Sequence, residues 1–287
     1  MNKWMKAASA ALLALTLSAC GSADTPKTEI APAADTGAKS VKEKEDKQTA
    51  KDVFRKTMEV SESIKSLHGK MTIDQNMKVV DDDSMRMKNK MTIEMDVITE
   101  PLTLHQTLDM TSDTDESMNM EMYAKDGELY MQMDDMEGGW LSVPPEMQDE
   151  ILTDMKSSNA MIELEVFQEF EDKFTLEEKD DQYVLHFKAS GEEFSDLLKE
   201  LMEQEAADVS EDGLSNIDVK KIDLTLYIDK DTYYTDSYDM QLDAIMDIGG
   251  YRTVALQTLN ADISKIDEVE PFDIPQEVID NAFSMDE

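Results

Sequence analysis

The sequence predicts an α+β protein built on one large antiparallel β-sheet. Long segments alternate apolar and polar residues, as expected of strands with one buried face and one hydrated face. Short acidic or glycine-containing stretches of the kind that form hairpin turns separate these segments. A few other segments place apolar residues at helical spacing, so we expect a small number of helices beside the sheet.

Residues 1–19 have the features of a signal peptide. Lys3 and Lys6 precede an uncharged apolar stretch, 7–17, that is too short to span a bilayer as a mature helix. The stretch runs into Leu-Ser-Ala-Cys-Gly at 17–21, which resembles the lipobox of bacterial lipoprotein signal peptides. That resemblance implies a diacylglyceryl group on Cys20 and cleavage before it. The alternative is an ordinary secretory signal followed by a chance cysteine.

Residues 20–49 are predicted to be a disordered linker. They contain Pro26, Pro32 and a charged run at 42–47, without any apolar periodicity. Cys20 is the single cysteine of the chain, which excludes disulfides and cysteine-based zinc sites. We therefore expect localisation at the cell membrane, with a lipid anchor holding the protein on the extracellular face.

Residues 50–287 are predicted to form a single β-rich domain. Thr49 and Asp52 have the spacing of a capping box and are expected to begin a helix. Its predicted apolar face consists of Val53, Phe54, Met58, Ser61, Ile64 and Leu67. Strands follow from residue 68, with turns expected at 81–84, 112–116 and 125–127, and a break at Glu100–Pro101.

Methionine dominates the apolar side of these first strands. The chain has 23 methionines, and many alternate with charged residues between positions 70 and 133. They fill irregular gaps in a core, but they also recur on surfaces that accept varied apolar partners. Two interpretations therefore stay open, a closed core and a partly open apolar cavity.

The second half mixes helical and strand patterns. A short strand is expected at 140–143, helical stretches at 144–155 and 162–170, a hairpin at 174–188 and a helix that begins at the capping box of Ser190 and Glu193. Segment 208–216 reads as a polar loop. Three long strands follow at 219–229, 234–248 and 251–263, and a last helix at 275–283 should place Val278, Ile279 and Phe283 on one side. About ten strands are expected in all.

This arrangement resembles the LolA-like superfamily of lipoprotein carriers, which includes lipoproteins of the LppX/LprG type. It is most similar to Firmicute lipoproteins of the DUF6612 type, and the local phrases YAKDGELYM at 123–131 and YIDKDT at 227–232 fit as well. The resemblance covers residues 52–283. It implies a curved open half-barrel with helices packed on its concave apolar face, and a cavity for acyl chains.

Composition and motifs exclude several functions. The formal net charge of −38 disfavours binding to nucleic acid, because proteins bind nucleic acid by neutralising its phosphates. The same charge would cause repulsion from anionic lipid headgroups. The sequence lacks a phosphate loop, a nucleophile elbow and HExxH, and its three histidines, His68, His105 and His186, are scattered. The acidic turns and the loop at 208–213 lack the full ligand spacing of calcium sites. We expect no enzyme activity, no cofactor and no metal; the sequence does not set the oligomeric state.

The candidate site is the inward side of the strands. We expect eight residues to line the space between sheet and helices: Met71, Met91, Met95, Met120, Met122, Met131, Leu224 and Met240. The expected partners are a lipid or other apolar small molecule and, through the anchor, the membrane. The alternative is an envelope accessory lipoprotein with a closed core and a protein partner.

Overall fold

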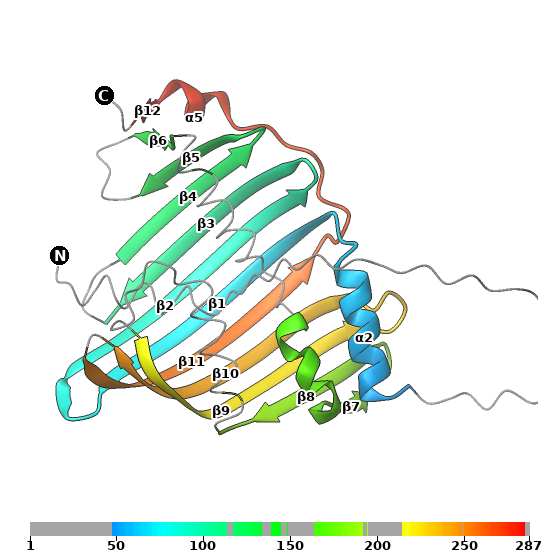
Figure 1. The fold of residues 1–287 in the computed structure, drawn as a ribbon. Coiled ribbons are helices and arrows are strands. Elements are labelled where there is room, and N and C mark those ends of the chain that lie inside the picture. Colours follow the sequence, from blue (N-terminus) through cyan, green and yellow to red (C-terminus); the bar gives the residue numbers. More distant parts are fainter. Residues whose placement is uncertain are drawn as a thin grey trace, which may run out of the picture.

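Twelve strands form a single open sheet, which is strongly twisted and whose two edges do not meet (Figure 1). The structure is a computed structural model, and it describes residues 48–113, 117–133, 139–144, 148, 164–191, 194, 214–248 and 250–284. Within these residues, no helix is long and apolar enough to cross a bilayer.

The strands are β1 (Ser66–Val79), β2 (Asp82–Thr99), β3 (Leu102–Ser112), β4 (Ser117–Lys125), β5 (Glu128–Met133), β6 (Trp140–Ser142), β7 (Thr175–Glu178), β8 (Gln182–Ala189), β9 (Leu214–Asp229), β10 (Thr235–Ile248), β11 (Tyr251–Ser264) and β12 (Ala282–Ser284). The helical segments among the described residues are α2 (Ala50–Ser61), the 3₁₀ helix η1 (Leu164–Lys173) and α5 (Gln276–Asp280).

The strand order is β12-β6-β5-β4-β3-β2-β1-β11-β10-β9-β8-β7. All neighbours are antiparallel except β12, which runs parallel to β6. β1 pairs with β2 on one side and with β11 on the other, so the first and the last long strands are neighbours near the middle of the sheet. The predicted fold class, an open and mainly antiparallel sheet with few helices, is confirmed.

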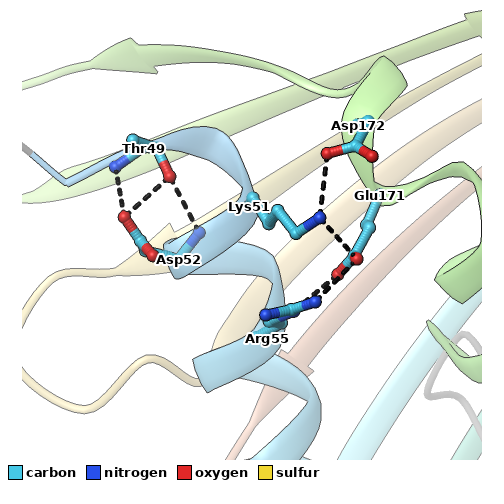
Figure 2. Close-up of polar contacts among 6 residues, drawn as sticks. All are labelled: Thr49, Lys51, Asp52, Arg55, Glu171 and Asp172. Carbon is cyan, nitrogen blue, oxygen red and sulfur yellow. Dashed lines mark hydrogen bonds and ion pairs between the residues drawn. The ribbon is translucent and has the colours of Figure 1, made fainter.

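Helix α2 begins where its capping box predicts. The Asp52 backbone N–H donates to Thr49 Oγ1 at 3.2 Å, and the Thr49 N–H donates to Asp52 Oδ2 at 3.0 Å (Figure 2). The helix ends at Ser61, however, so the predicted continuation of its apolar face to Ile64 and Leu67 is wrong. Leu67 belongs to β1, where it is buried in the sheet core.

Two cations tie α2 to η1. Arg55 Nε and Nη2 donate to the Glu171 carboxylate at 2.6 and 2.8 Å (Figure 2). Lys51 Nζ lies 2.8 Å from Glu171 Oε1 and 2.9 Å from Asp172 Oδ1. The hydrogen bonds from Arg55 and then Lys51 lower the pKa of Glu171 to about 2.

Aromatic packing fixes α2 and η1 against the sheet. Phe187 of β8 lies with its ring centroid 5.3 Å from that of Phe167 and 5.9 Å from that of Phe170, both on η1. Phe174 lies between Phe187 and Phe54 of α2, at 5.0 and 4.7 Å. The described helices α2 and η1 thus cover the β7–β9 end of one face (Figure 1). Helix packing over the rest of that face is not confirmed in the described part of the chain.

Three local predictions are wrong. The first hairpin turn lies at Val80 and Asp81, because Asp82 already pairs with Val79 and begins β2. Strand β9 begins at Leu214, inside the segment predicted as a polar loop. The last helix ends at Asp280, and Phe283 lies in β12 with 46% of its surface exposed, because pairing with β6 replaces the helical backbone.

Other local predictions fall partly outside the description. The helices expected at 144–155 and from Ser190 lie outside the described residues apart from Pro144, Gln148, Ser190, Gly191 and Phe194, as does most of the turn at 112–116. The tight turn at Asp126 and Gly127 is present, with φ of 53° and 80°. A positive φ favours glycine at position 127, because glycine has no Cβ that would clash in the left-handed region.

Candidate functional site

One face of the sheet is apolar across most of its width. Because cross-strand partners project to the same side, the register defines rows of side chains on this face. One row, from β8 to β4, is Phe187, Leu224, Met240, Leu259, Ile73, Met91, Met110 and Met118. The next row, from β8 to β5, is Leu185, Leu226, Tyr238, Ala261, Met71, Ile93, Leu108, Met120 and Met133.

The register places all eight predicted site residues on this one face. Met95, Met122 and Met131 form part of a third row on β2, β4 and β5, linked through Gln106 of β3. The remaining five, Met71, Met91, Met120, Leu224 and Met240, belong to the two rows above. Their common side is therefore established, whereas their role in lining a ligand site stays a prediction.

Burial differs strongly along this face. At β8 and β9 the face is closed, and Leu185, Phe187, Leu224, Leu226 and Ile228 are 0% exposed. Toward the other edge, β3 to β5 carry half-buried side chains, which we call the methionine patch: Met110, Met118, Met120, Met131 and Met133. Of the predicted site residues, Met120 and Met131 belong to this patch, and Leu224 lies in the closed end.

Amide side chains interrupt the apolar face. Gln75, Asn89, Gln106 and Gln257 lie in phase with the apolar residues of their strands, and all are at most 9% exposed. None of these four amides is among the eight site residues predicted from the sequence, all of which are apolar. The signal that could have found them is their phase, which matches the inward positions.

The opposite face is polar and carries two of the hollows outlined by described residues. One, of about 580 Å³, spans β1 to β3, β10 and β11. Another, of about 690 Å³, lies between Asp96, His105 and Tyr123 on the sheet and the segment 265–275 that follows β11. A third, of about 620 Å³, lies beside the start of α2 and β7. Among the described hollows, none is lined by the methionine patch.

The histidines lie on this polar face, each beside an acid. His68 Nδ1 lies 2.9 Å from Asp96 Oδ1, and His105 Nε2 lies 2.9 Å from Glu121 Oε1. The ring of His105 stacks on Tyr123, with centroids 4.3 Å apart. Within the described residues, no group of three or more His, Cys, Asp or Glu side chains could hold a metal ion.

A protein-family model matches residues 49–283, and it is described as a family of unknown function, DUF6612. The chain belongs to the DUF6612 family. This confirms the resemblance to the DUF6612 type found in the sequence. No curated protein matches this DUF6612 chain.

Three solved structures are distantly similar to this DUF6612 chain. A β-barrel-like DUF1849 protein from Brucella abortus is 10% identical, with 70% of this chain and 99% of that chain covered and a TM-score of 0.23. A LolA superfamily protein from Nitrosomonas europaea is 11% identical, with 80% and 97% covered and a TM-score of 0.19. A putative AttH from the same organism is 6% identical, with 71% and 52% covered and a TM-score of 0.23. Such TM-scores establish neither a common fold nor a ligand.

Proposed function

We propose that this DUF6612 chain is a lipid-anchored extracytoplasmic lipoprotein that binds a lipid or other apolar molecule on the methionine patch. The observation that carries the proposal is the contrast in burial along one face. The β8–β9 end is closed by phenylalanine packing, while Met110, Met120 and Met131 keep part of their surface accessible.

Side-chain chemistry supports an apolar ligand. Methionine has a flexible, unbranched side chain that adapts to ligands of varied shape. From Gly69 to Met77 of β1, and at the positions registered with them from β8 to β5, the residues on this face include no Asp, Glu, Lys or Arg. A charged ligand would therefore be desolvated there without a counter-charge, whereas acyl chains would lose only contact with water.

Native mass spectrometry of protein purified in mild detergent tests the binding. Wild type should retain a lipid, and Met120→Asp and Met131→Asp should reduce the retained lipid by about tenfold or more, because each places a charge in the patch. The matched control is Ser117→Asp, an exposed residue of the same strand β4 on the polar face. Circular dichroism checks folding, and Met120→Gln serves if the aspartate variants unfold. Wild type that retains no lipid under any mild condition contradicts the proposal.

Anchoring is tested at Cys20, which lies outside the described residues. Cys20→Ala should remove palmitate labelling and move the protein from the membrane fraction to the soluble extracellular fraction. Unchanged membrane association would contradict the anchor.

A second candidate function is an accessory lipoprotein that binds a protein partner. The hollow of about 690 Å³ beside the segment 265–275 favours it, because the surface there combines charged residues with Phe272 and Tyr123. In that case, capture of a partner should survive Met131→Asp and be lost on substitution of Glu268 or Glu270.

A further inference from the structure

Three amide side chains form a band across the apolar face. Gln257 of β11, Gln75 of β1 and Asn89 of β2 are successive cross-strand neighbours, so they lie side by side in one row. They are 7, 5 and 9% exposed, respectively. These three residues, the amide band, thus place polar atoms in a buried part of the sheet.

Apolar rows flank the amide band on both sides. The row of Ile73 and Met91 lies on one side and continues to Met110 of the methionine patch. The row of Met77, with Met87 and Ala255 as its cross-strand partners, lies on the other side. The band is therefore a polar strip between two apolar strips, and it adjoins the proposed binding surface.

Two atoms of the band lack a hydrogen-bond partner. Gln75 Oε1 is a buried acceptor and Gln257 Nε2 is a buried donor, and neither is paired in the structure. Buried polar groups are almost always hydrogen-bonded, since an unpaired one has lost its water without compensation. An acceptor and a donor on adjacent strands together match a hydroxyl, which can donate to Gln75 Oε1 and accept from Gln257 Nε2.

We propose that the amide band binds the uncharged polar group of an acylated ligand, a hydroxyl or a hydroxyl beside an ester, whose chains lie on the methionine patch. The inference rests on the proposed function and narrows its ligand class. An ester carbonyl suits Gln257 Nε2 as an acceptor. An anionic headgroup does not suit the band, because the registered positions around it carry no cation on this face.

Competition among three probes tests the inference. Delipidated wild type should bind dioleoylglycerol, which has a hydroxyl and two esters, about tenfold more tightly than squalene, which has no polar group. It should bind dioleoylphosphatidylglycerol, which is anionic, more weakly than dioleoylglycerol. The double variant Gln75→Leu/Gln257→Leu should bind squalene as well as wild type or better, and its preference for dioleoylglycerol should disappear.

Two controls distinguish an effect on binding at the amide band from an effect on folding. Replacing both amides by apolar groups removes two buried unpaired atoms, so the double variant should melt at or above the wild-type temperature. Gln132→Leu makes the same chemical change on β5, on the opposite face, and should leave the preference unchanged. Wild type that binds none of the three probes overturns the proposed function. Wild type that binds dioleoylglycerol and squalene equally, or a double variant with unchanged preference, overturns only the amide band.

Discussion

Arg55 donates a hydrogen bond to each carboxylate oxygen of Glu171, from Nε at 2.6 Å and from Nη2 at 2.8 Å. The two residues are 116 positions apart, so the contact joins the first helix of the domain to η1. A guanidinium matches a carboxylate in this two-point geometry, which a lysine in place of Arg55 could not reproduce. The contact holds η1 over the phenylalanine core at the closed end of the sheet.

The first prediction concerns acid stability. Because the pKa of Glu171 falls to about 2 from an ordinary 4.5, its stabilising contribution is complete above about pH 4.5 and is lost as the pH falls toward 2. Glu171→Gln should lower the melting temperature at neutral pH, and the difference from wild type should vanish between pH 4.5 and 2. A difference that stays constant down to pH 2 contradicts this assignment.

The second prediction concerns the closed end. Phe187 is 0% exposed and its ring lies near those of Phe167, Phe170 and Phe174. Phe187→Ala should therefore reduce the free energy of unfolding by about 3–5 kcal/mol in urea denaturation. Phe283→Ala, at a 46% exposed position, is the control and should change it by at most about 0.5 kcal/mol. Equal effects of the two substitutions would argue against the core position of Phe187.

The third prediction concerns alkaline titration. Burial, followed by the charges of Glu121 and Glu277, raises the pKa of Tyr123 to about 12. Because the folded-state pKa exceeds the ordinary 10, the stability that Tyr123 contributes is complete below pH 10 and is lost between 10 and 12. In an absorbance titration of phenolate, Tyr123→Phe should remove one step near pH 12, and Glu277→Gln should move that step to lower pH. Loss of a step near pH 10 instead would contradict the burial of this hydroxyl.

The fourth prediction concerns the segment that leads to the last strand. Lys125 Nζ donates to Phe272 O at 2.8 Å and to Asp273 Oδ1 at 2.5 Å, which fixes this segment to the end of β4. Lys125→Met should raise amide hydrogen exchange over 266–284 by about tenfold, because local opening becomes easier. Lys188→Met, at a surface lysine paired with Asp223, should leave exchange in that range unchanged.

Alternation along the strands sufficed to predict the sheet and its apolar face. Met71 and Met91 fall in phase with their neighbours, and the register confirms that they share a side. The turn at Asp126 and Gly127 was equally readable, because glycine marks its left-handed residue. These features are local, so a single segment of sequence contains the information that specifies them.

Long-range pairing could not be predicted in the same way. Phe283 has helical spacing from Ile279, yet it lies in β12 beside β6, a partner about 140 residues earlier in the chain. The phase of Gln75 and Gln257 can be seen in the sequence, but their adjacency in the amide band cannot, because they become neighbours only when β1 pairs with β11. The ligand role of the eight inward residues stays a prediction, because the register shows their common side and not what they bind.

The pairing of β1 with β11 also governs the timing of folding. His68 pairs with Ser264, so the middle of the sheet stays open until nearly the whole polypeptide is available for folding. Strands β1 to β5 can pair early as consecutive hairpins. Their apolar face then remains exposed until β8 to β11 complete the sheet. Contacts between residues so distant in sequence form slowly, and hairpins with an exposed apolar face are prone to aggregate in the meantime. We therefore expect the unfolded chain to depend on a chaperone until β11 pairs with β1.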